Sequence, residues 1–182
     1  MRLFFAILFS DTLRREIAAV QSVLKSHAVR GSFSRPDNLH LTLSFLGETP
    51  PCALPVLRTC MQKAASGEKA FSLSFERLGR FRRREGDLVF WSLDASPALL
   101  SLQARLQDAL LQHNIPFDDK PFRPHLTLGR RVCFEEGFSY SSYPLPSLEA
   151  TVTSFSLMES KRLDGRLTYV PLHRISLAAS TL

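Results

Sequence analysis

The chain has 182 residues, 45% of them hydrophobic, and its formal net charge is +6. A single packed domain fits this length, and the basic charge favours an anionic partner, of which nucleic acid is the first candidate. No stretch approaches the about 18 apolar residues of a membrane span, and three Cys without a CxxC pair indicate reduced thiols in a cytoplasmic protein.

The first half of the chain is predicted to alternate strands and helices. Residues 2–9 are apolar and of strand length, and the charged residues that follow at once argue against a signal peptide. Apolar residues then recur at helical spacing behind a cap at Ser10 or Asp11. The predicted order is a strand at 2–9, a helix at 11–27, a connector at 28–38, a strand at 39–46, a helix after Pro50-Pro51 and a strand at 71–75.

The second half begins with an arginine-rich stretch, 79–87, which fits either a solvated hairpin loop or a loop that contacts phosphates. The remaining elements follow from apolar runs, from a helix start with proline in its first turn, and from Asp164-Gly165, a dipeptide typical of tight hairpin turns. They are a strand at 88–93, a helix from Ser96-Pro97, a connector at 114–123, a strand at 124–130, an exposed loop at 131–150 and a hairpin of 152–160 with 167–177.

Two tetrapeptides of the form His-x-Thr-x stand inside the predicted strands 39–46 and 124–130. Residues two apart in a strand point to the same face, so His40 shares a face with Thr42, and His125 shares one with Thr127. The intervening leucines are expected to fill the core on the other face. A single His-x-Thr is more often structural, but two copies at matching positions indicate a function.

The two halves of the chain also repeat. Apolar segments at 4–7 and 90–93 are each followed by a helix and then by a His-x-Thr-x strand, whose histidine lies 33 and 32 residues after the segment ends. We therefore expect a single domain, 1–182, of two lobes related by an approximate two-fold axis, each contributing one motif, at 40–43 and at 125–128. Such an arrangement sets the two motif histidines opposite each other in a groove.

Two facing imidazoles supply a general acid and a general base near neutral pH, because their ordinary pKa is about 6.5. Hydrolysis of a phosphodiester needs both, one to deprotonate water and one to protonate the leaving alkoxide on the other side of phosphorus. The hydroxyls of Thr42 and Thr127 can donate to phosphoryl oxygens. Arg130, near the end of its strand, either clamps the phosphate or caps the strand.

Other roles for these residue types are less well supported by the sequence. Histidines are common metal ligands, but Cys is absent close to the motifs and carboxylates there are few. Cys133 and Ser44 follow the motifs without a spacing that marks a nucleophile. Phe5 and Trp91 fit either a base-stacking role or the core equally well.

Longer blocks around both motifs resemble a known family. The blocks are 2–7, 38–48, 121–130 and 165–172, and together they extend over nearly the whole chain. They make the chain similar to the 2H phosphoesterase superfamily, which is named for its two His-x-Thr-x motifs. Within it, the chain most resembles the bacterial RNA 2′,3′-cyclic phosphodiesterases, also called 2′-5′ RNA ligases or the LigT type.

The resemblance implies a two-lobed, LigT-like α+β fold whose antiparallel sheets face a central groove, with helices outside. It implies hydrolysis of a terminal 2′,3′-cyclic phosphate on RNA to a 2′-phosphomonoester, without a metal or another cofactor. His40 is then the proton donor to the leaving 3′ oxygen and His125 the proton acceptor from water, while Thr42, Thr127 and Arg130 bind the phosphate. In reverse, with an RNA 5′-hydroxyl in place of water, the same groups join ends through a 2′-5′ linkage.

Two other functions stay open. The groove and the basic charge also fit a non-catalytic RNA-binding module. The motifs equally fit a sister activity on another phosphodiester, such as 2′-5′ oligoadenylate or a cyclic ADP-ribose phosphate. The partners expected are RNA or nucleotide 2′,3′-cyclic phosphate ends, with no membrane and no metal, and we expect a monomeric, cytoplasmic protein.

Overall fold

The computed structural model describes residues 1–140 and 143–179, and these form an α+β fold, as expected. The helices are α1 (Asp11–Ser26), α2 (Leu54–Ala65) and α3 (Pro97–Gln112), with 3₁₀ turns at Pro36–Asn38 and Pro51–Ala53. The strands are β1 (Arg2–Leu8), β2 (Ala28–Phe33), β3 (His40–Glu48), β4 (Phe71–Phe81), β5 (Asp87–Leu93), β6 (His125–Phe134), β7 (Glu149–Val152), β8 (Ser154–Leu163) and β9 (Arg166–Ser176).

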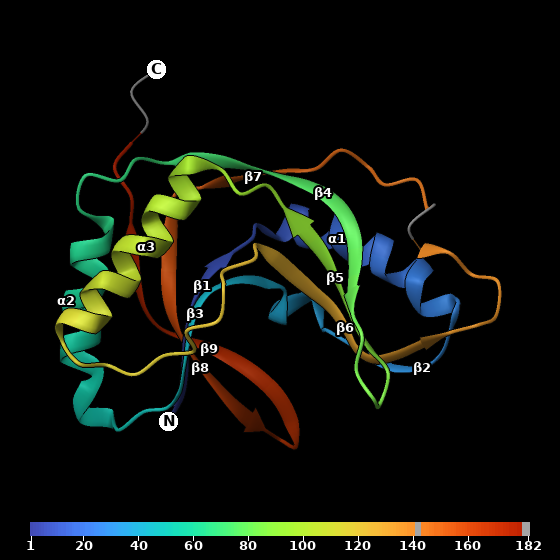
Figure 1. Ribbon diagram of the computed structural model, residues 1–182, viewed down its shortest axis with the longest axis horizontal. Helices are drawn as coiled ribbons and strands as arrows, with labels where there is room; N and C mark the ends of the chain where they lie inside the picture. The colour runs from blue at the N-terminus through green and yellow to red at the C-terminus, as the bar shows by residue number, and fades with distance from the viewer. Residues whose placement is uncertain (141–142, 180–182) are drawn as a thin grey trace.

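The described strands pair antiparallel into one curved sheet, in the order β7-β4-β5-β6-β3-β1-β8-β9, with β2 also paired to β6. The order is balanced about the central β6–β3 pair, since β5 and β4 lie on one side and β1 and β8 on the other. Figure 1 shows α2 and α3 side by side at one end of the molecule and α1 toward the other end. This arrangement fits two lobes related by a two-fold axis, and that division stays a prediction.

The main core lies between the sheet and the helices. β1 is buried on both faces, which explains its uninterrupted apolar run. Phe5 belongs to the large cluster that includes residues of all three helices, whereas Phe4 belongs to a small cluster with Ala6 and Met158. Because alternate residues point to opposite faces, this small cluster marks the face of the sheet that turns away from the helices.

Two strands extend into stretches where the sequence predicts loops. The connector 28–38 contains β2, whose side chains are mostly exposed and so give no apolar alternation to detect. The predicted loop 131–150 is shorter in the structure. Its first residues belong to β6, which pairs with β2 as far as Phe134, and its last residues belong to β7. Tertiary pairing, rather than local hydrophobic pattern, therefore sets these boundaries.

The two hairpins follow their turn residues closely. β8 and β9 are joined by Asp164 and Gly165, both at positive φ (49° and 74°), as a tight hairpin turn requires. β4 extends to Phe81, so the first part of the predicted loop 79–87 belongs to a strand. Gly79 permits this pairing, because a Cβ there would lie 2.4 Å from the ring of Phe90.

A buried amide joins α1 to the sheet. Gln21 is only 6% exposed, and its Nε2 donates to the carbonyl oxygen of Ser34 at 2.8 Å and to that of Leu128 at 2.7 Å. The second carbonyl belongs to the His-x-Thr-x segment of β6. The helix therefore fixes the backbone that carries the second motif.

Replacing Gln21 by Met keeps the length of the side chain and removes both donations. Because buried carbonyls then lose a partner, we expect the free energy of unfolding to fall by about 1–3 kcal/mol. Urea denaturation followed by circular dichroism measures the change. Gln62→Met, on the exposed side of α2, is the control and is expected to stay within about 0.5 kcal/mol of the wild type. Equal stability of the two variants would contradict the bridging role.

Candidate active site

The two His-x-Thr-x strands are neighbours at the centre of the sheet. β3 and β6 pair antiparallel with Leu41 opposite Leu126, and both leucines are 0% exposed. These leucines are the second residues of their motifs, so the two tetrapeptides meet directly. Because both leucines point into the core, the histidine and threonine of each motif lie on the opposite face.

The register also fixes which side chains are adjacent. In an antiparallel pair, one step forward on one strand matches one step back on the other, so His40 lies across from Thr127. By the same step, Thr42 lies across from His125. Each histidine is thus next to a threonine of its own motif and to a threonine of the other.

Both motif histidines are held through Nδ1. The Nδ1 atom of His40 lies 2.7 Å from the carbonyl oxygen of Asn38, and that of His125 lies 2.6 Å from the carbonyl oxygen of Arg123. A carbonyl only accepts, so Nδ1 donates in both rings and Nε2 is left to exchange a proton with a ligand. In the free protein the Thr42 hydroxyl donates to His40 Nε2 over 3.0 Å, and a ligand at that nitrogen must replace it.

Aromatic rings pack against both imidazoles and shield them in part from water. Each histidine contacts one aromatic residue from the repeated apolar segments, 4–7 or 90–93, and one from a neighbouring hairpin strand. The shielding is therefore similar on the two sides of the site. The centroid distances are 5.0 Å from His40 to Phe4, 5.1 Å from His40 to Tyr169, 5.4 Å from His125 to Phe90 and 5.6 Å from His125 to Phe81.

This burial shifts both histidines toward the neutral form. Loss of solvation lowers the pKa of His40 to about 4; the hydrogen bond to Asn38 opposes the shift, and the charges of Arg130 and His125 add to it. Loss of solvation also lowers the pKa of His125, against its hydrogen bond to Arg123 and with Arg130 again adding to the shift. Both rings are therefore neutral near pH 7 in the free protein, and a bound anion would raise both pKa values.

A β-bulge at the last residue of each motif determines which of the following side chains point to the groove face. The pairing of β3 with β1 skips a residue at Leu43, and that of β6 with β5 skips one at Leu128. Each strand therefore has two successive buried residues. After them, the side chains that point to the groove are shifted by one position along the strand. Phe45 and Arg130 consequently occupy matching positions that line the groove.

Arg130 stands close to both imidazoles, since its charge acts on the pKa of each. Within residues 1–140 and 143–179, no carboxylate forms an ion pair with its guanidinium, and the side chain is exposed. An unpaired guanidinium beside two neutral imidazoles favours a bound phosphate, which accepts from its planar fork of N–H groups.

Three adjoining cavities open on this face and share their lining residues. One of about 480 Å³ is lined by His40, Thr42 and Arg130, among others. One of about 280 Å³ is lined by His40, Arg130 and Thr127. A third of about 410 Å³ is lined by Thr42 and His125. The five residues that the sequence singles out therefore surround one continuous groove.

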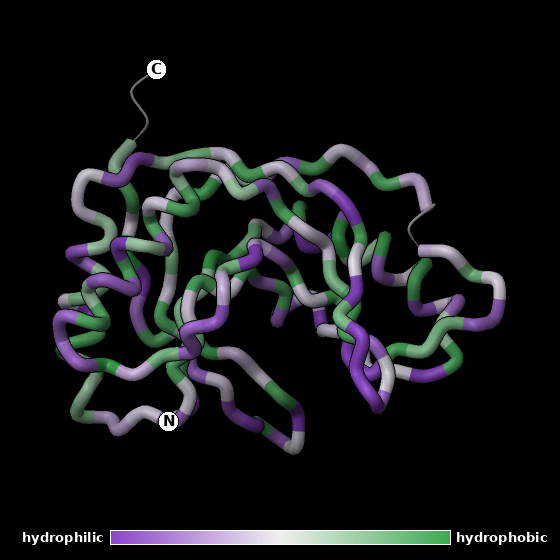
Figure 2. Tube along the Cα trace, viewed as in Figure 1, coloured by the Kyte–Doolittle hydropathy of each residue, from purple (hydrophilic) through white to green (hydrophobic). Residues whose placement is uncertain are grey.

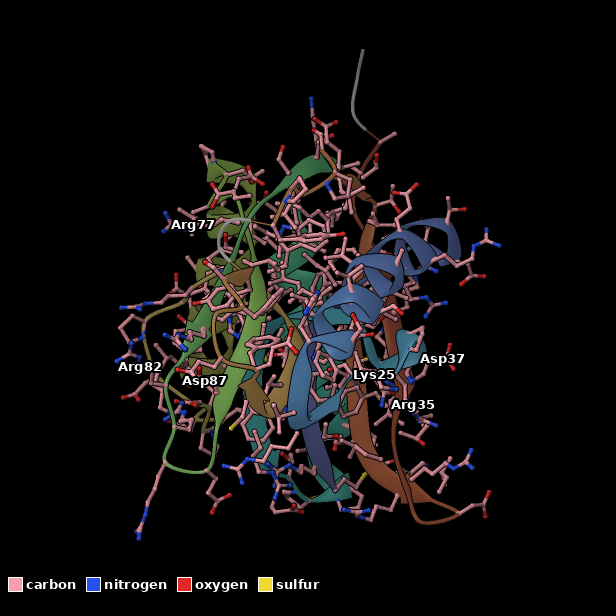
Figure 3. All side chains as sticks on the ribbon, turned by 90° about the vertical axis from the view of Figure 1, so that its right-hand side faces the viewer. Lys25, Arg35, Asp37, Arg77, Arg82 and Asp87 are labelled. Carbon is pink, nitrogen blue, oxygen red and sulfur yellow. The ribbon has the colours of Figure 1, made fainter. Side chains whose placement is uncertain are left out.

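The margin of this groove is basic. The β8–β9 hairpin contributes Lys161, Arg162 and Arg166 to the cavities around His40, and Figure 2 shows hydrophilic residues along this hairpin. Arg35, labelled in Figure 3, donates to the Leu167 carbonyl at 2.7 Å and so ties the hairpin to the segment before the first motif. Several basic side chains therefore lie along the margin of the groove, where they favour an anionic ligand.

The sequence predicts that the arginine-rich stretch 79–87 is either a solvated hairpin loop or a loop that contacts phosphates, and its arginines differ in this respect. Arg80 pairs with Asp87 at 2.9 Å across the base of the hairpin, and Arg82 extends away from the molecule in Figure 3. Arg83 instead lines the cavity beside His125. Most of this stretch is therefore a solvated hairpin tip, and one of its arginines is within reach of a ligand.

The base-stacking alternative for Phe5 and Trp91 is wrong, because both side chains are 0% exposed in the core. The aromatic residues that line the groove are instead Phe45, Tyr169 and Phe81. Strict alternation after the first motif would turn Phe45 toward the core, so only the bulge reveals it. Tyr169 comes from the distant β8–β9 hairpin; it lies in the block 165–172 that resembles the family, but no hydrophobic pattern marks it as a residue of the groove.

The other residue types considered for chemistry lie apart from the two imidazoles or inside the protein. Ser44 is 5% exposed, and Arg30 Nε lies 3.1 Å from the half-buried Cys133 Sγ on the β2 side of β6. Over the described residues, no three His, Cys, Asp or Glu side chains gather closely enough to hold a metal ion. Of the helices described, none is long and apolar enough to cross a bilayer.

Comparison with known proteins agrees with this geometry. The RNA 2′,3′-cyclic phosphodiesterase of Thermus thermophilus is 30% identical over 191 residues, which cover 97% of this chain and 90% of that protein. The crystal structure of TT0787 from the same species superposes with a TM-score of 0.83 at 27% identity over the whole of both chains. That of Escherichia coli LigT complexed with 3′-AMP gives a TM-score of 0.79 at 30% identity over 97% of each chain. Since the family model described as the 2′-5′ RNA ligase superfamily matches residues 9–164, the chain belongs to that superfamily.

Proposed function

We propose that this protein hydrolyses the 2′,3′-cyclic phosphate at RNA ends to a 2′-phosphomonoester, with His40 as the proton donor and His125 as the proton acceptor. The observation that carries the proposal is the β3–β6 register, which brings both motifs onto one face of the sheet. The names of the relatives, RNA 2′,3′-cyclic phosphodiesterases, support the choice of substrate.

The chemistry needs a proton removed on one side of phosphorus and a proton delivered on the other. His125 Nε2 takes a proton from water as its oxygen forms a bond to phosphorus. The bond from phosphorus to the 3′ oxygen breaks, and His40 gives that oxygen its proton. The Nδ1 hydrogen bonds to backbone carbonyls hold each ring in the tautomer that leaves Nε2 toward the groove.

The phosphoryl oxygens gain negative charge in the transition state and need donors that are already in place. Thr42 and Thr127 offer hydroxyls from the two motif strands, and Arg130 offers a guanidinium beside both imidazoles. The bound anion also restores His40 to its protonated form, because a nearby negative charge raises the pKa of an imidazole. Substrate binding and activation of the acid are coupled in this way.

With an RNA 5′-hydroxyl as the nucleophile, the same groups support ligation. An RNA 5′-hydroxyl replaces water, His125 removes its proton, and a 2′-5′ linkage forms if the cyclic phosphate opens at its 3′ oxygen. Another phosphodiester substrate is the alternative, whereas the names of the relatives speak against a non-catalytic RNA-binding module. The monomeric state, the cytoplasmic setting and independence from metal stay predictions.

The first test separates catalysis from binding. His40→Ala and His125→Ala are each expected to lower kcat/KM for a nucleoside 2′,3′-cyclic phosphate by about 10²–10⁴, because each removes one proton-transfer group. The assay is run in EDTA with product identification by ³¹P NMR. A 2′-phosphate product from the wild type supports the proposal. Full activity in either variant, or no turnover by the wild type while RNA still binds, would contradict it.

The second test assigns the two roles. A 4-nitrophenyl phosphodiester has a leaving group stable as an anion, so it needs no proton donor. His40→Ala is therefore expected to lose much less activity on this substrate than on the cyclic phosphate. His125→Ala is expected to lose a similar factor on both. The opposite pattern would show that His125 is the acid and His40 the base.

The third test uses pH. Since burial lowers the pKa of both histidines in the free protein, the optimum of kcat/KM is expected below pH 6.5. The optimum of kcat is expected at a higher pH, because the bound phosphate raises both pKa values. Steady-state rates between pH 4 and 9 measure the two profiles. Coincident optima above pH 7 would mean that the free-protein histidines are not shielded as described.

A further inference from the structure

The cavity beside His125, which we call the α3 cavity, differs in character from the rest of the groove. Its walls include the rings of Phe45, Phe81 and Phe122, and its remaining lining includes Gln103 and Gln107 of α3. Basic residues line both parts of the groove: Arg83, Lys120 and Arg123 in the α3 cavity, and Arg130, Lys161 and Arg162 in the cavity beside His40, which also holds Phe4 and Tyr169. What distinguishes the α3 cavity is that three phenylalanine rings and two amides of α3 line it together, which suits a flat ring with polar edges.

One polar side chain in the lining of the α3 cavity, that of Gln103, has no hydrogen-bond partner in the described residues. Gln103 is 6% exposed, and no hydrogen bond to its side-chain amide is found there. Nearby, the Ser44 hydroxyl is buried and also without a described partner. The amide of Gln103 thus has free hydrogen-bonding capacity at the wall of the cavity, and a ligand in the cavity can use it. By contrast Gln21, the other buried glutamine described, donates to two carbonyls.

The walls of the α3 cavity are held in place by the motif strand itself. The β3 bulge turns Phe45 toward the groove, and the carbonyl oxygen of Phe45 accepts from the backbone N–H of Asp118 at 2.9 Å. This bond fixes the connector that carries Phe122. The Asp118 carboxylate is paired with Lys120 at 2.7 Å, so it presents little free negative charge to a ligand.

We propose that the α3 cavity is a nucleobase pocket, in which the base of the nucleotide bound at the two histidines stacks on the aromatic walls and is read by the Gln103 amide. An amide offers one acceptor and two donors, which match the hydrogen-bonding edge of a base. Aromatic side chains provide stacking surfaces for unpaired bases. Thr42 lines both this cavity and the phosphate site, which makes the two continuous. The proposal deepens the proposed function and rests on it.

The test compares substrates with and without a base. Kinetics are measured for adenosine 2′,3′-cyclic phosphate and for the base-free methyl ribofuranoside 2,3-cyclic phosphate. The ratio of their kcat/KM values is expected to fall about tenfold in Gln103→Met, which keeps the side-chain length but loses the amide. Phe45→Leu, which removes a stacking ring, is expected to lower the ratio as well. Gln112→Met, exposed at the end of α3, is the matched control and keeps the wild-type ratio.

Two further measurements complete the test. One asks whether Gln103 has a purely structural role, and the other measures binding in the pocket without catalysis. Gln103→Met is expected to keep its melting temperature, because no described protein group loses a partner, whereas Gln21→Met is expected to lose stability. If the wild type turns over neither substrate, the proposed function fails, and binding of adenosine 2′-phosphate against ribose 2-phosphate by calorimetry tests the pocket alone. An unchanged ratio in Gln103→Met, or equal affinity of the wild type for the two phosphates, would overturn the nucleobase pocket.

Discussion

The site depends on one backbone pairing, Leu41 opposite Leu126 at the centre of the sheet. Two buried leucines fix the register, because a slip of one residue in either strand would turn its leucine out of the core and its histidine into it. The functional groups are thus placed by the residues between them. The strands that carry the site are also the strands that join the two halves of the sheet, so the protein cannot lose this geometry without losing its central pairing.

The same burial that holds the histidines keeps them from binding a second proton in the absence of substrate. Aromatic packing and Arg130 favour the neutral imidazole, and the carbonyl bonds at Nδ1 only partly oppose them. A phosphodiester brings the charge that the free site lacks. In the proposed reaction its binding does two things at once, since it neutralises the guanidinium and returns a proton to the imidazole that is to act as the acid.

The sequence predicts the motif strands, the three helices and the β8–β9 hairpin, because each has a local signal: alternation, helical spacing, caps or turn residues. His40, Thr42, His125 and Thr127 follow from period-two alternation alone. Phe45 does not, since its orientation depends on a bulge that is set by pairing with β1. β2 and Tyr169 are equally hidden, because an exposed strand and a side chain from a remote hairpin leave no pattern near the motifs.

The two halves of the chain differ at one pair of matching positions beside the site. The positions after the two bulges match in the backbone but carry Phe45 on one strand and Arg130 on the other. An arginine extends the groove toward phosphate, whereas a phenylalanine extends it toward an apolar ring. A symmetric scaffold can place acid and base on either side of phosphorus, but it cannot by itself choose the direction in which a nucleotide lies. In the proposed complex, that choice falls to the unlike residues at these two positions and to the cavities they border, because a base held in the α3 cavity would decide which ester oxygen faces the proposed proton donor.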